Sequence, residues 1–164
     1  MLGYKDLPFE IIQTGEFYYD LLKSGKIKIA RKIKTPVTLQ DPCNIIRRAG
    51  AADKFRYFVN ETCEDFTEMY PNREHNFCCN AGGGLAGLSN WTAHKARGNR
   101  VKAEQIKATG AKIVITPCHN CSTGIKDVIK YWDLGVKNIF FDEILLATME
   151  MPEELKLKKE TGKG

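Results

Sequence analysis

The sequence has no run of apolar residues long enough to cross a lipid bilayer, so we expect no direct membrane insertion. Its first residues lack the basic-then-apolar pattern of a secretory signal, which favours a cytoplasmic location. Zinc-finger spacing, an aromatic RNA-binding signature and a long basic arm are also missing, so no nucleic-acid partner is expected. The 164 residues contain no internal repeat and no low-complexity linker, and they fit one compact domain.

Two basic stretches contribute to the net charge of +5. Residues 151–164 contain four lysines, and we predict that they form a basic, flexible tail. Residues 94–107 contain three lysines and two arginines against one glutamate. This stretch suits an acidic partner or an anionic substrate, although a solvated helix face is the commoner explanation of such a run.

The pattern of apolar residues predicts that helices and strands alternate along the chain. Strands are expected at 37–39, 112–116 and 136–140, with a weaker one at 76–77 and an extended piece at 27–33. Helices are expected at 14–25, 44–62, 92–108, 122–132 and 142–149, and Trp91, Trp132 and Phe140 are expected in the core. This order indicates an α/β fold, a mostly parallel sheet flanked by helices. Residues 1–36 would then form an N-terminal helix and lead-in segment, and residues 37–150 the main domain.

Six cysteines are the most informative residues of the chain. Without an export signal they argue against a disulfide framework, because a reducing cytosol keeps thiols reduced. Metal binding or redox chemistry is the better explanation. Five of the six form a pattern, in which two spacers of 34 and 38 residues separate Cys43, Cys78-Cys79 and Cys118-x-x-Cys121. Cys63 lies outside this pattern, and we expect it to be a small buried hydrophobic residue.

The predicted strands suggest that these five cysteines meet. Cys43, Cys78 and Cys118 each come shortly after a predicted strand, and the carboxyl ends of parallel strands share one edge of a sheet. Adjacent residues of an extended chain point to opposite faces, so Cys78 and Cys79 can face one site only if the backbone bends there. The glycine-rich residues 81–87 make such a bend feasible.

The number of thiols helps to choose between metals. Structural zinc takes four ligands, so one of five thiolates would have no role at a zinc ion. A cluster of several iron atoms can take more than four, and the usual ferredoxin cysteine runs are absent. The residues therefore indicate an unusual multi-iron cluster, or four ligands and one reactive thiol, with zinc as the alternative.

Other interpretations concern single motifs. Cys118-x-x-Cys121 taken alone is typical of a thioredoxin-like redox site. Gly82, Gly84 and Gly87 formally match a dinucleotide-binding fingerprint, but backbone clearance beside a cluster explains them better. His119 could donate a hydrogen bond to a cluster sulfur or relay a proton, and a surface histidine is an equally good explanation. For His75 a surface position is the better one.

The cysteine pattern resembles the cysteine-rich CCG domain found in the B-type and D-type subunits of heterodisulfide reductase and in related proteins of membrane-bound sulfate-respiration complexes. The resemblance covers residues 14–146 and includes Asp41-Pro42 before Cys43 and the glycines after Cys79. Residues 73–84 (REHNFCCNAGGG) and 115–121 (ITPCHNC) look most like the sulfate-respiration branch. One difference is Asn80, which stands where the family usually has a glycine.

This resemblance implies a cofactor, a noncubane 4Fe–4S cluster held by Cys43, Cys78, Cys79, Cys118 and Cys121. It also implies a function in electron transfer, the reduction of a protein or small-molecule disulfide in two one-electron steps, with iron capturing a released thiolate. The chain would then be part of a disulfide oxidoreductase. The alternative is a non-catalytic electron-transfer or docking module of a larger respiratory complex, stabilised by zinc or by a cluster.

The resemblance further implies partners. Family members usually carry two copies of this domain, whereas this sequence has one. We therefore expect the chain to act with other subunits or with a second CCG domain of a redox complex. A membrane cytochrome subunit is one candidate, and it would bring the chain to the membrane without inserting it.

Overall fold

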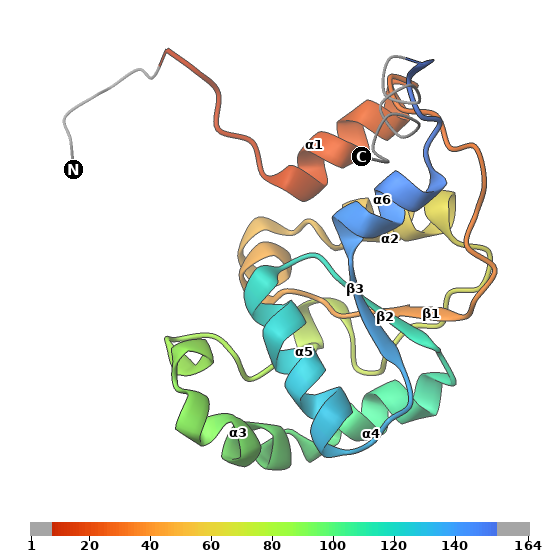
Figure 1. Cartoon of the computed structure of the whole chain (residues 1–164). Coiled ribbons are helices and arrows are strands. Elements are labelled where there is room, and N and C mark those ends of the chain that lie inside the picture. The colour runs from red at the N-terminus through yellow and green to blue at the C-terminus, as the bar shows by residue number, and fades with distance from the viewer. Residues whose placement is uncertain (1–7, 154–164) are drawn as a thin grey trace, which may run out of the picture.

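Three parallel strands form the sheet at the centre of the protein, β1 (Val37–Leu39), β2 (Ile113–Thr116) and β3 (Lys137–Phe140) (Figure 1). The computed structural model describes residues 8–153. β2 lies between the other two strands and is buried along its whole length, which suits its apolar sequence IVIT. The register pairs Val37 with Ile113 and Ile113 with Lys137. The predicted α/β fold with a parallel sheet is confirmed.

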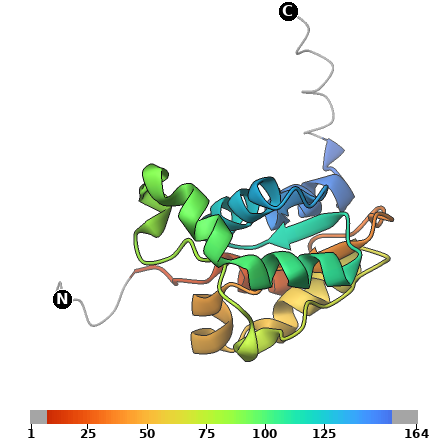
Figure 2. The ribbon, with the colours of Figure 1, turned by 90° about the horizontal axis from the view of Figure 1, so that it is seen from below.

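Helices cover both faces of this sheet (Figures 1 and 2). Residues Ile113 and Ile115 of β2 pack into one apolar cluster with α1, α2 and α6, while Val114, on the opposite face, packs into a second cluster with α4 and α5. The helices are α1 (Thr14–Lys23), α2 (Ala52–Thr62), α3 (Thr92–Gly98), α4 (Arg100–Thr109), α5 (His119–Tyr131) and α6 (Phe141–Thr148). Short turns of other helix types are η1 (Asn44–Arg48), η2 (Arg73–His75), η3 (Leu85–Gly87) and η4 (Ser89–Trp91).

Two predicted helices are each divided in the structure. The helix expected at 92–108 breaks at Asn99, whose backbone leaves the helical conformation while its side-chain amide donates a hydrogen bond to the carbonyl of Cys78, 3.2 Å away. The helix expected at 44–62 is a π-helical turn, η1, followed by α2, with Gly50 in the left-handed region between them. The helix expected at 122–132 begins earlier, at His119.

The strand expected at 76–77 was a wrong prediction. Side chains occupy the backbone groups that a strand would pair, since Arg47 donates to the carbonyl of Asn76 and Gln40 to that of Phe77. The extended piece at 27–33 forms only isolated bridges, from Ile29 to Met149 and from Ile33 to Cys63.

The predicted core contains one error. Trp91 is 53% exposed, whereas Trp132 and Phe140 are half-buried and pack against the two apolar clusters. Cys63 is buried in the first cluster, as predicted. No helix within residues 8–153 has the length and apolar character needed to span a membrane. The predicted tail, 151–164, lies outside the described residues from position 154 onward.

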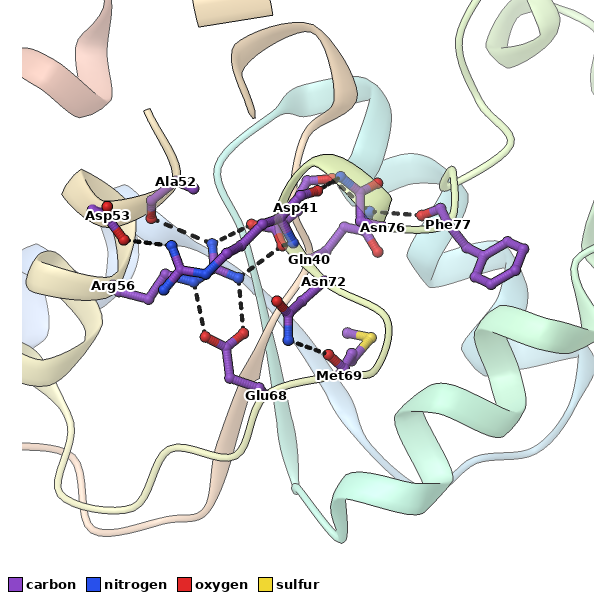
Figure 3. Close-up of polar contacts among 11 residues, drawn as sticks. Gln40, Asp41, Ala52, Asp53, Arg56, Glu68, Met69, Asn72, Asn76 and Phe77 are labelled. Carbon is purple, nitrogen blue, oxygen red and sulfur yellow. Dashed lines mark hydrogen bonds and ion pairs between the residues drawn. The ribbon is translucent and has the colours of Figure 1, made fainter. Parts of the chain in front are cut away.

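A buried ion pair joins the loop after β1 to α2 (Figure 3). Arg56, whose side chain is 7% exposed, binds both carboxylate oxygens of Asp41 and, with its other edge, both oxygens of Glu68. Burial lowers the pKa of Arg56, but hydrogen bonds to the two carboxylates outweigh burial and raise it above its ordinary value. Asp41 also accepts a hydrogen bond of 2.7 Å from the backbone N–H of Arg73. One carboxylate thus fixes three chain segments.

We expect Arg56→Met to lower the free energy of unfolding by about 3–5 kcal/mol, because it leaves the Asp41 carboxylate buried and unpaired. Denaturant unfolding followed by circular dichroism measures this loss. The control is Arg100→Met, which breaks an exposed pair with Glu104 and should cost at most about 0.5 kcal/mol. If both variants lost the same small amount of unfolding free energy, the buried ion pair would not be needed for stability.

Candidate metal centre

The five cysteines of the pattern line one pocket. The cavity has a volume of about 60 Å³, and all five residues are free cysteines. They come from three segments: the loop after β1 with the start of η1, the irregular segment after η2, and the start of α5. The residues around the pocket are Pro42, Cys43, Asn44, Ile45, Cys78, Cys79, Gly82, Cys118, Asn120 and Cys121. The tertiary structure therefore brings together the set that the sequence singled out.

Cys118 and Cys121 lie at the beginning of α5. Pro117 and Cys118 follow β2 directly, and Cys118 is the residue that precedes the helix. A hydrogen bond from the Cys121 thiol lowers the pKa of Cys118 to about 5 against the opposing effect of burial, and the backbone N–H groups of Cys121 and Asn120 add to this. The helix start therefore holds Cys118 as a thiolate at neutral pH.

Cys79 is linked to the same two sulfurs. A hydrogen bond from Cys121 lowers the pKa of Cys79 to about 7 despite burial. The pKa of Cys121 is raised, because its thiol proton is held by hydrogen bonds to Cys118 and Cys79 and because it is buried. The three sulfurs thus share a proton on Cys121 that must leave when a metal binds all of them.

The backbone bend expected between Cys78 and the glycines occurs at Asn80. This residue has φ +62°, in the left-handed region, and its N–H donates to the sulfur of Cys78 over 3.2 Å. Asparagine tolerates this conformation better than most residues with a side chain. Its side chain also donates to the carbonyl of Lys95. Asn80 can therefore replace the usual glycine, and its side chain adds a hydrogen bond to α3.

The remaining predicted site residues differ in their relation to the pocket. Of the three fingerprint glycines only Gly82 lines it, and a Cβ atom built on any of the three would meet nothing within 4 Å, so no contact within the described residues requires a glycine at these positions. The exposed ring of His119 stacks on Phe140, with 4.5 Å between ring centroids, and does not line the pocket. Its charge nevertheless contributes to the lowered pKa of Cys118. His75 is exposed and faces Glu74.

Gly124 shapes the site and was missed at the sequence level. A Cβ atom built on it would lie 2.4 Å from the carbonyl oxygen of Cys79 and 2.9 Å from the Cβ of Ala81. Helix α5 can therefore approach the Cys79 segment only with a glycine here. A glycine one turn after Cys121, inside a predicted helix, was the available signal.

The number of thiols suits several metal atoms better than one. Among residues 8–153, no group of three histidine, cysteine, aspartate or glutamate side chains is arranged to hold a metal ion. Five thiols nevertheless border one pocket, and those of Cys79 and Cys118 have lowered pKa values. A closed four-ligand zinc site needs all its donors around one point, whereas a sulfur cluster spreads its ligands over several metals.

We expect Gly124→Ala to destabilise the protein by about 1–3 kcal/mol, because the added methyl must displace the backbone of Cys79. Thermal unfolding measures the loss. Gly98→Ala is the matched control: Gly98 is also helical, and nothing lies within 4 Å of its added Cβ, so the variant should be as stable as the parent or more so. An unchanged midpoint in Gly124→Ala would show that the contact is not tight.

Comparison with known proteins agrees with this site. A profile of the cysteine-rich domain family CCG matches residues 37–126, a range that contains all five pocket cysteines. The D-type subunit of dihydromethanophenazine:CoB–CoM heterodisulfide reductase from Methanosarcina mazei is 37% identical over 129 residues, which are 77% of this chain and 31% of that relative. No solved structure matches the chain at a significant level.

Two further relatives are more distant. The Hdr-like menaquinol oxidoreductase iron-sulfur subunit of Archaeoglobus profundus is 31% identical over 134 residues, 77% of this chain and 24% of the relative. EtfAB:quinone oxidoreductase of Syntrophomonas wolfei is 27% identical over 149 residues, 87% of this chain and 21% of the relative. The chain thus spans less than a third of these relatives. Because the family profile covers more than half of the chain and every pocket cysteine, this chain belongs to the CCG cysteine-rich domain family.

Proposed function

We propose that this chain is an iron–sulfur redox module of a heterodisulfide-reductase-like subunit, and that it passes electrons to a disulfide. The observation that carries the proposal is the meeting of five free cysteines from three chain segments at one pocket. The cofactor would be a noncubane 4Fe–4S cluster, with its ligands Cys43, Cys78, Cys79, Cys118 and Cys121.

The protonation of the thiols supports binding of a cluster. Metal binds the thiolate, and Cys118 is already a thiolate at neutral pH, while Cys79 has a pKa of about 7. The thiol of Cys121 keeps its proton while it donates hydrogen bonds to Cys118 and Cys79. Binding of a cluster by all three sulfurs would release that proton. When bound, the cluster supplies single electrons and a metal that binds thiolate.

The number of donors favours a cluster over zinc. Zinc would leave at least one of the five thiols without a role. Two similar proteins also support iron, one named a heterodisulfide reductase subunit and the other an iron-sulfur subunit.

The pocket rim supports a reaction with an external disulfide. Cys78 is exposed, and Asn44 and Asn120 beside the pocket are exposed as well, so a substrate sulfur has access from solvent. Cys79 and Cys121, in contrast, are buried. Because the match covers less than a third of each similar protein, we propose that other subunits or a second CCG domain deliver the electrons.

We expect protein purified without oxygen to contain about four iron atoms and about four acid-labile sulfides per chain. Cys79→Ser should lose most of this iron, because it removes a buried ligand, whereas Cys63→Ser, the matched control in the first apolar cluster, should retain it. Metal and sulfide analysis checks both. One zinc ion without sulfide would refute the cluster, and equal losses in the two variants would refute the ligand assignment.

A separate measurement addresses the disulfide. In the oxidised protein we expect an added thiol, the half-product of disulfide cleavage, to change the electron paramagnetic resonance spectrum, because its sulfur enters the pocket beside Cys78. Oxidised protein with an alcohol of the same size is the control. An electron paramagnetic resonance spectrum that is the same with and without the thiol would indicate that the chain passes electrons to a partner and has no substrate site of its own.

A further inference from the structure

Lys102 of α4 is a lysine buried without an ordinary partner. Its side chain is 1% exposed, and its only hydrogen-bond acceptor in the described part of the chain is the thioether sulfur of Met69, at 3.8 Å. Lys95, the other buried lysine, instead donates to the carbonyl of Leu85 at 2.8 Å and lies 3.9 Å from Asp127. An ammonium in an apolar interior is costly unless negative charge lies near it.

The negative groups that act on Lys102 are Asp41 and three sulfurs of the pocket, those of Cys79, Cys121 and Cys78. Met69, its acceptor, belongs to the same apolar cluster as Cys79 and Cys121. Burial lowers the pKa of Lys102 to about 8, while the charges of Asp41, Cys79, Cys121 and Cys78 oppose that effect. Asp41 already shares the single charge of Arg56 with Glu68. A cluster bound by the five cysteines would add thiolate charge to the negative groups that act on Lys102.

We propose that Lys102 is the buried counter-charge of the five-cysteine centre, where its ammonium offsets the charge of the thiolates and raises the reduction potential of the cluster. This inference rests on the proposed function. Reduction adds an electron to a centre that already carries several thiolate charges. A nearby cation in a low-dielectric interior stabilises the reduced state more than the oxidised one.

Lysine suits this role because its charge is compact. The ammonium is a point charge on a flexible side chain, so it does not need the bidentate carboxylate partner that a guanidinium prefers. Helix α4 also supplies the apolar side chains Ala103 and Ile106 to the cluster that contains Met69, Cys79 and Cys121, so the helix that carries Lys102 packs against the segments that carry these sulfurs. A lysine that served only to fill space would leave the reduction potential unchanged when replaced by an apolar residue of similar length.

The test is a redox titration of the loaded full chain, followed by electron paramagnetic resonance, together with iron analysis and far-UV circular dichroism. We expect Lys102→Met to shift the one-electron equilibrium about tenfold toward the oxidised state, which is a midpoint lower by about 59 mV. Lys102→Arg keeps the charge and should stay close to the parent. Lys107→Met removes an exposed lysine of the same helix and should also leave the midpoint unchanged.

Each outcome is decisive. An unchanged midpoint in loaded Lys102→Met overturns the inference. If Lys102→Met folds but holds no iron while Lys102→Arg holds it, the need for the charge is upheld. Loss of iron or of folding in both variants shows that the shape of lysine matters and overturns the inference. Parent protein without iron overturns the proposed function itself, a result that the iron analysis reports separately.

Discussion

The ion pair between Arg56 and Asp41 determines how the chain approaches its cysteine pocket. Asp41 lies two residues before Cys43, and it also binds the backbone N–H of Arg73, which leads into the Cys78 segment. Two of the three cysteine-bearing segments are therefore fixed by one carboxylate. Burying such a pair contributes little net stability, because desolvation offsets the attraction between the charges. We infer that its main effect is to make one arrangement of these segments much more stable than its alternatives.

The third segment is held by packing. β2 is the central strand, and its direct continuation into α5 fixes where Cys118 and Cys121 emerge from the sheet. Gly124, one turn further, lets α5 contact the backbone of Cys79. This contact fixes the position of the Cys118–Cys121 segment relative to the Cys78–Cys79 segment. Asn99, which lies between α3 and α4, also holds the Cys78 segment, because its side-chain amide donates a hydrogen bond to the carbonyl of Cys78. The pocket thus forms only when the sheet and both helical layers are assembled.

Charge explains why a cluster of thiols can remain reactive inside this fold. The start of α5 directs backbone N–H groups toward Cys118, the N–H of Asn80 points to Cys78, and the charge of a buried lysine acts on the innermost sulfurs. Each of these contacts favours the thiolate, the form that binds metal. The pKa values of Cys118 and Cys79 are lowered, whereas those of Cys78 and Cys121 are raised. Cys63 is buried in the other apolar cluster, where burial raises its pKa, so position in the fold separates Cys118 and Cys79 from Cys63.

The amino-acid sequence by itself determined the cysteine pattern, the α/β order and the strand Ile113–Thr116, because spacing and periodicity are local properties that can be read along the chain. Only the tertiary structure decided the break at Asn99, the irregular backbone before Cys78, and the exposure of Trp91. It likewise decided the close contact of Gly124 and the burial of Lys102. These features depend on which distant segments come into contact, and contacts of that kind leave no periodic pattern in a single sequence.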